Sequence, residues 1–108
     1  MVTLANTQNY SEFELHARAI LEIPVDEIKL LKNGASAVVL AKETNNNFPV
    51  FSGLDNAVSI PNSDFKIFGK PSSRPYRRMA VGLSYGVNEP VEELVLKAKT
   101  VADSIKIG

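Results

Sequence analysis

The sequence predicts an α+β fold that is rich in β-structure. Three short apolar runs bounded by turn residues predict strands at 35–41, 65–68 and 79–85. An apolar stripe at helical spacing from Pro90 to about Ile105 predicts a helix that covers these strands. A second helix is expected from Ser11 to about Ile23, before the strands begin.

The helix near the N-terminus has a well-marked start. Ser11 is a good N-cap, and Glu14 lies three residues later, which is the spacing of a capping box. Glu14 and Arg18 are spaced for an i,i+4 ion pair. Pro24 is expected to stop the helix, and residues 1–9 are expected to be extended, with Val2, Leu4 and Ala5 as a strand end.

Turn chemistry divides the middle of the chain. Asn33-Gly34 predicts a turn just before a buried strand at 35–41. Residues 48–60 are mixed in character, with Gly53, Asp55 and Asn56 as turn residues. Gly82 interrupts the strand at 79–85, where it predicts a bulge or a close approach of backbone. Pro90 fits the first position of the last helix.

Composition excludes several classes of protein. The chain has 108 residues, 44% of them hydrophobic, and twelve Lys and Arg balance twelve Asp and Glu. A net charge of zero argues against a dedicated nucleic-acid binder, and no apolar run is long enough to cross a membrane. The first residues lack the features of a signal peptide, and the absence of cysteine excludes disulfides and thiolate chemistry. A cytoplasmic location is therefore expected.

Positive charge is concentrated in one segment. Between Asp64 and Glu89 there is no acidic residue, while five cations lie within thirteen residues: Lys66, Lys70, Arg74, Arg77 and Arg78. Such a segment has the composition of an anion site. Gly69 permits close backbone approach beside Lys70, and the guanidinium fork of arginine fits phosphate oxygens. The pattern Gly-Lys-Pro followed by Arg77-Arg78 therefore suggests a phosphate clamp.

Two other interpretations of this segment remain open. The cations could be solvated, or they could pair with acids elsewhere, such as Glu89, Glu92 or Glu93. In addition, consecutive residues of a strand point to opposite faces. Arg77 and Arg78 can therefore share one phosphate only if the backbone bends between them or if one binds through its N–H group.

No other segment predicts chemistry. His16 is the only histidine, and Glu12 precedes it by one helical turn, but a partly exposed helix residue is the simpler interpretation. The sequence contains no Walker-type phosphate loop, no HExxH and no GxSxG. No catalytic, cofactor-binding or metal-ligating residue is therefore assigned.

Several strings resemble one family in order along the chain. They are Thr3-Leu4-Ala5-Asn6-Thr7-Gln8, residues 11–19 (SEFELHARA), Pro24-Val25, residues 34–40 (GASAVVL), Phe68-Gly69-Lys70-Pro71 and residues 77–81 (RRMAV). Together they look like the C-terminal part of formate-dependent phosphoribosylglycinamide formyltransferase, an ATP-grasp enzyme. The ATP-dependent carboxylase that acts on aminoimidazole ribonucleotide is the closest rival, but the helix string and the Arg-Arg pair favour the formyltransferase.

The resemblance implies a role in purine biosynthesis. Such enzymes activate formate with ATP through formyl phosphate and transfer the formyl group to the amine of glycinamide ribonucleotide. In that family the lysine of Gly-Lys-Pro and the two arginines contact the ribonucleotide, whose 5′-phosphate is their natural counter-ion. These are Lys70, Arg77 and Arg78 here, whereas Arg74 lies in a variable part of the loop and is not included.

The resemblance also implies how the chain is organised. It would cover only the last quarter to third of such an enzyme, so the ATP lobe and the magnesium ligands would precede Met1. Residues 1–31 would be the strand-helix tail of the ATP-grasp domain. Residues 32–108 would be a small antiparallel β-sandwich or barrel-like domain, a rudiment hybrid motif with a C-terminal helix. The region 45–47 looks longer than the usual loop and is expected to affect only the surface.

Beside the carboxylase, one further hypothesis is kept. A non-enzymatic module that binds an anion or a partner would be monodisperse and would lack an exposed apolar face. A fragment would instead expose a large apolar patch where residues 1–31 lost their neighbours, and it would dimerise through that patch. A biotinyl or lipoyl carrier is disfavoured because the sequence has no Met-Lys-Met hairpin.

Overall fold

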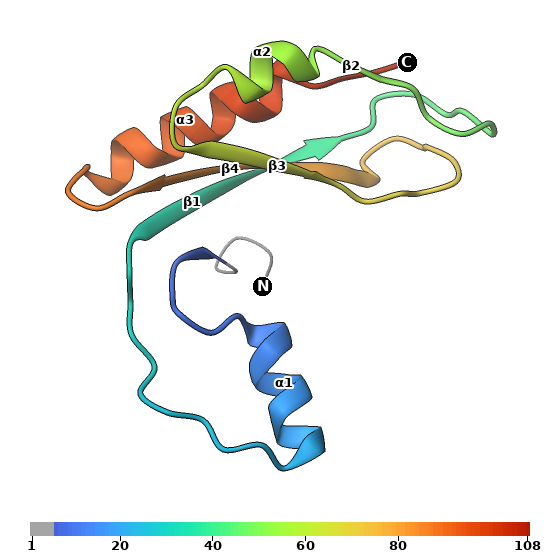
Figure 1. Ribbon diagram of the computed structural model, residues 1–108. Helices are drawn as coiled ribbons and strands as arrows, with labels where there is room; N and C mark the ends of the chain where they lie inside the picture. The colour runs from blue at the N-terminus through green and yellow to red at the C-terminus, as the bar shows by residue number, and fades with distance from the viewer. Residues whose placement is uncertain (1–5) are drawn as a thin grey trace.

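The computed structural model describes residues 6–108, and Figure 1 shows its helices and strands. The strand end expected at Val2, Leu4 and Ala5 lies outside these residues. The elements are α1 (Glu12–Leu21), β1 (Asn33–Leu40), β2 (Phe51–Ser52), α2 (Leu54–Val58), β3 (Ser63–Ile67), β4 (Arg78–Gly86), α3 (Val91–Ser104) and β5 (Lys106–Ile107).

The centre of the molecule is a three-stranded antiparallel sheet in the order β1-β4-β3. It contains all three strands that the sequence predicts. The central strand β4 is buried at every position after Arg78. The edge strand β1 alternates between buried and exposed residues, so the expectation of a fully buried strand is wrong for one of its faces.

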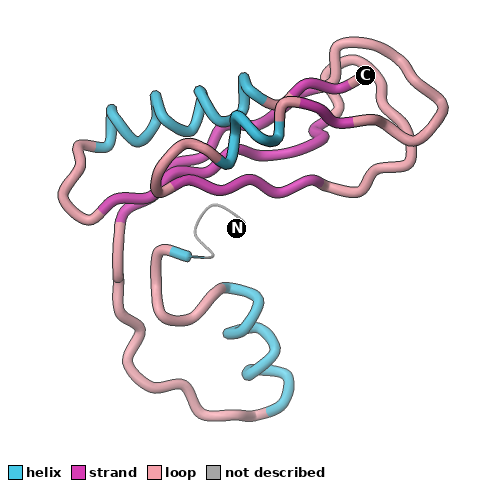
Figure 2. The backbone as a smooth tube through the Cα atoms, turned by 45° about the horizontal axis from the view of Figure 1, so that its top comes forward, coloured by secondary structure: helices cyan, strands magenta, loops and turns pink. Residues whose placement is uncertain are grey.

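Helix α3 packs along one face of this sheet (Figures 1 and 2). Its buried residues Leu94, Ala98 and Val101 meet β1 and β4. A β-carbon at Gly82 would lie 2.7 Å from the backbone nitrogen of Ala102 and 2.8 Å from the carbonyl oxygen of Ala98. The close approach predicted at Gly82 is therefore confirmed.

Short elements complete the layer over the sheet. Helix α2 packs against α3, and β2 pairs with β5 in a separate two-stranded sheet. The class is α+β, with antiparallel sheets and a C-terminal helix, as the sequence predicts. The layer opposite the main sheet is helical, where a second sheet of a β-sandwich was expected. Residues 54–58, expected as turns, form helix α2 instead.

Asn33-Gly34 is not a turn, and the prediction there was wrong. Both residues belong to β1, where they pair with Gly86 and Tyr85. A β-carbon on Gly34 would lie 2.9 Å from Cγ2 of Thr7 and 3.2 Å from the ring of Tyr85. A methyl group at this position would therefore press against the side chains of Thr7 and Tyr85.

Residues 6–31, which we call the N-terminal lobe, contain α1. The Ser11 hydroxyl accepts a 3.1 Å hydrogen bond from the Glu14 backbone N–H, as predicted for the cap. The Glu14 carboxylate pairs with Arg18 at 3.2 Å. The helix ends at Leu21, before Pro24, because Glu22 adopts a left-handed conformation (φ 56°) and the Ile23 N–H bonds back to the Arg18 carbonyl.

The N-terminal lobe stands away from the sheet (Figures 1 and 2). The radius of gyration of the Cα atoms is 15.8 Å, whereas a compact domain of this length would have about 13 Å. None of the ten residues of α1, all of them described, is buried. The lobe is joined to the sheet by a few contacts, among them a 3.3 Å hydrogen bond from Asn6 to the Tyr85 hydroxyl.

Within residues 6–108, no helix has both the length and the apolar character needed to cross a membrane.

Candidate functional site

The cations predicted to bind an anion lie in or beside residues 68–77, the connection from β3 to β4, which we call the basic loop. Its start is tied to the sheet by a 2.9 Å bond from the Phe68 N–H to the Met79 carbonyl. Gly69 follows with a positive φ of 38°, a conformation that glycine adopts without strain. Lys70, half-buried, comes next. The glycine therefore sets the direction in which the chain presents this lysine.

The far side of the basic loop is pinned by the strand extension after β1. The Tyr76 N–H donates to the Ala41 carbonyl at 2.9 Å, and the Ala41 N–H donates to the Arg77 carbonyl at 2.9 Å. Tyr76 itself is left-handed (φ 67°) and its side chain is exposed. A bulky residue in this region is strained, so the two bonds to Ala41 hold a sharp bend directly before Arg77.

The side chain of Arg77 is also held. Its guanidinium Nη1 donates to the hydroxyl oxygen of Ser72 at 3.3 Å. Its own N–H donates to the Arg74 carbonyl at 3.0 Å. Arg77 is half-buried, its backbone is bonded within the loop, and one hydrogen bond restrains its head group.

Arg78 begins β4 and is exposed. The ladder between β1 and β4 shifts at this point, because Val39 pairs with Ala80 whereas Leu40 pairs with Arg78. Met79 is thus an extra residue on β4, and such a bulge bends the strand. The sharp bend at Tyr76 lies before Arg77 and this bulge lies after Arg78, so both flank the arginine pair and neither lies between the two residues.

Acidic side chains do not neutralise these cations. Among residues 6–108, no ion pair includes Lys70, Arg77 or Arg78. Glu89, an acid that could have paired with them, instead binds Lys97 at 3.1 Å. Of the five cations in the segment, Lys66 alone has a carboxylate partner within the described part of the chain, Asp64 at 3.3 Å. The three candidate residues therefore keep their positive charge available.

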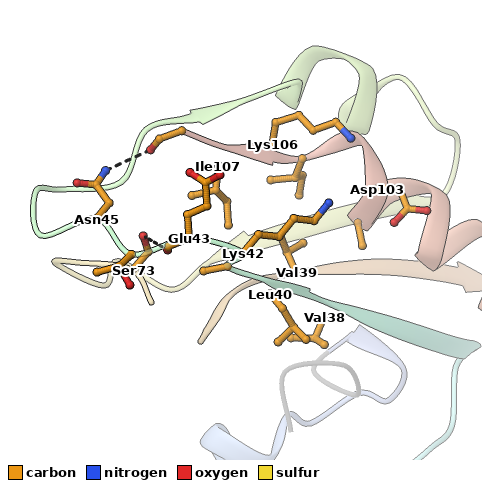
Figure 3. A pocket seen from close by; sticks show the side chains of 15 residues that line it. Val38, Val39, Leu40, Lys42, Glu43, Asn45, Ser73, Asp103, Lys106 and Ile107 are labelled. Atoms are coloured by element: carbon orange, nitrogen blue, oxygen red, sulfur yellow. Dashed lines mark hydrogen bonds between the residues drawn. The ribbon is translucent and has the colours of Figure 1, made fainter. Parts of the chain in front are cut away.

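A hollow in the described residues lies away from these three cations. It has a volume of about 840 Å³ between the end of β1, the loop after it and the C-terminal residues (Figure 3). Its lining includes Ser73 of the basic loop but none of Lys70, Arg77 and Arg78. Lysines and carboxylates both line it, so it has no clear preference for an anion.

The loop after β1 does more than shape the surface, which corrects the expectation for residues 45–47. Asn45 and Ser73 exchange two backbone hydrogen bonds of 3.0 and 2.9 Å. The Ser73 hydroxyl also donates to the Glu43 carbonyl at 3.2 Å, and the Asn45 amide donates to the Gly108 carbonyl at 3.4 Å (Figure 3). These bonds tie the basic loop to the C-terminal end of the chain.

Two other titratable side chains, His16 and Tyr85, lie outside the basic loop. His16 is exposed on α1, as expected for a helix surface residue. Burial raises the pKa of the Tyr85 hydroxyl above its usual 10.0, although a hydrogen bond from Asn6 acts in the opposite direction. Within the described chain, no group of three or more His, Cys, Asp or Glu residues is placed to hold a metal ion.

Sequence reasoning missed the residues that hold the site. Ser72, Ala41 and Asn45 carry no charge, and only pairing between distant segments gives them a role. The sequence offers one indication of such a residue, the hydroxyl of Ser72 two positions after Lys70.

Comparison with known proteins identifies the family. The family model described as "PurT, C-terminal" matches residues 34–105. Formate-dependent phosphoribosylglycinamide formyltransferase from Flavobacterium psychrophilum is 56% identical over the whole chain, and the enzyme of the same name from Chlorobaculum tepidum is 56% identical over 99% of it. The chain spans only 28% and 27% of the length of these two relatives.

A solved structure of a different enzyme is also similar to this chain. The crystal structure of N5-carboxyaminoimidazole ribonucleotide synthetase from Thermotoga maritima superposes with a TM-score of 0.82 at 28% identity. The match covers 96% of this chain and 28% of that protein. The family model covers well over half of the chain, and the similarity to the formyltransferases extends over its full length. The chain therefore belongs to the PurT C-terminal family.

Proposed function

We propose that this chain is the C-terminal part of a formate-dependent phosphoribosylglycinamide formyltransferase and supplies part of its ribonucleotide site. The complete enzyme would use ATP to activate formate as formyl phosphate and would transfer the formyl group to the amine of glycinamide ribonucleotide. The observation that carries this proposal is the basic loop. It holds three cations that have no carboxylate partner among the residues that the structure describes, in a chain that is 56% identical to such an enzyme from end to end.

Lys70, Arg77 and Arg78 are assigned to the 5′-phosphate of the ribonucleotide. Arginine binds phosphate oxygens through two parallel N–H bonds, and lysine adds a point charge. Arg77 is already fixed by Ser72 and by the bonds to Ala41 and Arg74, so little side-chain entropy would be lost on binding. Neutralising the dianion at this end leaves the amine end of the substrate free to reach the activated formate.

The remaining parts of the enzyme would lie outside this chain. We assign residues 1–31 to the tail of the ATP-grasp domain and residues 32–108 to a small C-terminal domain of the rudiment hybrid-motif type. ATP and Mg²⁺ would be held by the preceding part of the enzyme, so the chain alone is expected to be inactive. We place the assembled enzyme in the cytoplasm, as a homodimer that uses neither nucleic acid nor membrane as a partner.

The exposed apolar side chains of the N-terminal lobe favour a part of an enzyme over a self-contained binding module. Eight large apolar residues are exposed between positions 13 and 31: Phe13, Ile20, Leu21, Ile23, Val25, Ile28, Leu30 and Leu31. The fraction exposed reaches 68% at Ile20 and 72% at Leu30. A patch of this kind marks a surface that another part of a protein covers.

One alternative enzyme has an observation in its favour. The structural match to N5-carboxyaminoimidazole ribonucleotide synthetase makes an ATP-dependent carboxylase of aminoimidazole ribonucleotide the second candidate. Both substrates carry the same ribose 5-phosphate, so the basic loop would serve either. The identity of 56% to the formyltransferases, against 28% to the synthetase, favours the first candidate.

Exchange of segments between relatives tests the proposal. The 108 residues would replace the matching C-terminal segment of the Flavobacterium psychrophilum enzyme, and formate-dependent formylation of glycinamide ribonucleotide would be assayed. We expect an active hybrid. Lys70→Ala or Arg77→Ala should raise the KM for the ribonucleotide roughly tenfold to a hundredfold and leave the KM for formate nearly unchanged.

Two results would count against the proposal. Equal changes in both KM values would remove the assignment of the basic loop to the ribonucleotide. A hybrid that turns over aminoimidazole ribonucleotide and not glycinamide ribonucleotide would support the carboxylase instead. Lys99→Ala, on the exposed surface of α3, is the matched control and should change neither constant.

A further inference from the structure

The hydroxyl of Ser72 is the only side-chain partner of the Arg77 guanidinium among the described residues, with Nη1 donating to Oγ at 3.3 Å. We propose that Ser72 is a positioning residue, which orients Arg77 toward the phosphate of the bound ribonucleotide. This inference rests on the proposed function, because it takes Arg77 as a phosphate ligand. It adds a residue that carries no charge and acts on the substrate only through its neighbour.

The backbone around the pair is fixed, which gives the side-chain bond its effect. Arg77 is held through its carbonyl by Ala41 and through its N–H by Arg74. On the other side, Ser73 is held by two backbone bonds to Asn45. Ser72 and Arg77 thus approach each other from two anchored points, and the remaining freedom lies in the arginine side chain itself.

Arginine has many rotamers, and most of them would point the fork away from a given anion. A hydrogen bond to one nitrogen restricts these rotamers before the substrate arrives, so less entropy is lost when the phosphate binds. The bond uses Nη1, and the guanidinium has five N–H donors, so the others remain available for phosphate oxygens. A neutral acceptor suits this role because it orients the guanidinium without neutralising it.

Lys70 provides an internal contrast. Among the described residues, no hydrogen bond or ion pair fixes its ammonium group, and the space beside Gly69 is open, because a β-carbon added there would meet no atom within 4 Å. Lysine acts as a flexible point charge and needs no fixed plane. The site thus combines the oriented guanidinium of Arg77 with the ammonium group of Lys70, which no bond among the described residues holds.

Binding of ribose 5-phosphate to the full chain tests this inference. The probe carries the phosphate end shared by both candidate substrates, and its affinity can be followed by NMR titration together with the side-chain Nε–H signal of Arg77. We expect Ser72→Ala to weaken binding about threefold to tenfold and to broaden or shift the Arg77 signal before any ligand is added. Ser72→Thr, which keeps the hydroxyl, should restore both readouts.

A double-mutant cycle separates positioning from a general loss of structure. In the Arg77→Ala background, Ser72→Ala should have no further effect on affinity, because the group through which it acts is gone. Ser52→Ala, an exposed serine in β2, is the matched control and should leave affinity and the Arg77 signal unchanged.

The outcomes distinguish this inference from the proposed function. If Arg77→Ala weakens binding while Ser72→Ala does not, the positioning role is overturned and the site assignment stands. If Ser72→Ala weakens binding equally in both backgrounds, Ser72 acts independently of Arg77 and the inference is again wrong. If ribose 5-phosphate leaves the Arg77 signal of the unmodified chain unchanged at every concentration tested, both the inference and the assignment of Arg77 are wrong.

Discussion

Gly82 shows how one residue sets the distance between the sheet and its covering helix. It lies in the central strand β4, under α3, where a β-carbon would approach the Ala102 nitrogen to 2.7 Å and the Ala98 oxygen to 2.8 Å. Both atoms belong to the helix backbone and cannot rotate away. Adding one methyl group there must push α3 off the sheet.

We therefore expect Gly82→Ala to lower the free energy of unfolding by about 1–3 kcal/mol, the usual cost of overpacking a core. Urea denaturation followed by circular dichroism measures the change. Gly34→Ala is the matched control, because its β-carbon would first meet Cγ2 of Thr7, the end of a side chain, at 2.9 Å. Its loss should be smaller, and an equal loss in both variants would contradict the backbone argument.

The residues of the candidate site were predictable to different degrees. The lack of a nearby acid in the sequence pointed to the cations of this segment, and the resemblance to the formyltransferases narrowed them to Lys70, Arg77 and Arg78. Ser72 and Ala41 could not be named, because their roles depend on hydrogen bonds whose partners lie 5 and 36 residues away in the chain. The bend at Arg78 also depends on pairing with β1, since a bulge is a property of two strands.

Among the helices and strands, the long elements were predicted from the sequence and the shortest ones were not. Helix α3 carries an apolar stripe over fourteen residues and was predicted within a residue or two of its observed bounds. Its Pro90, expected at the first helical position, is the N-cap. Helix α2 has five residues, and β2 and β5 have two each, which is too short for a period to appear. β2 and β5 form by pairing with each other, and α2 packs against α3.

Helix α1 depends on its own local interactions because none of its residues is buried. We expect Ser11→Ala to remove the bond to the Glu14 N–H and to cost the helix about 1 kcal/mol. Amide hydrogen exchange should then become faster throughout residues 14–21 and stay unchanged in β4. Ser11→Asp, which retains a capping oxygen, should leave exchange as it is. Loss of protection in β4 as well would show that α1 and the sheet unfold together.

The whole molecule has two parts with different degrees of burial. The sheet and α3 enclose a core in which Ala80, Leu94 and Val101 have no exposed surface. The N-terminal lobe instead exposes Ile20, Leu21 and Leu30 to 67–72% of their area. The sequence predicted such a patch for residues 1–31 because a strand and a helix cannot enclose a core. Its extent is visible only once the lobe is seen to stand away from the sheet.

This asymmetry predicts how the chain behaves in isolation. Burying an apolar side chain stabilises an association by about 25 cal/mol per Å² removed from water, so the lobe favours contact with a second copy when nothing else covers it. Light scattering after size exclusion should show a mass that rises with concentration. Ile20→Lys combined with Leu30→Lys should shift the chain toward the monomer without lowering its free energy of unfolding, because both side chains are already exposed.

The control uses the same chemistry on the other part of the molecule. Val58→Lys combined with Leu96→Lys replaces side chains that are 63% and 64% exposed on α2 and α3, and it should leave the association unchanged. In the hybrid enzyme, the preceding domain would cover the lobe. The double substitution of Ile20 and Leu30 by lysine should therefore prevent the lobe from packing against that domain, whereas the control substitutions should not. A chain that stays monomeric at every concentration, together with a hybrid that tolerates both lysines, would mean that this apolar surface faces solvent in the enzyme and that residues 1–31 are not part of its ATP-grasp domain.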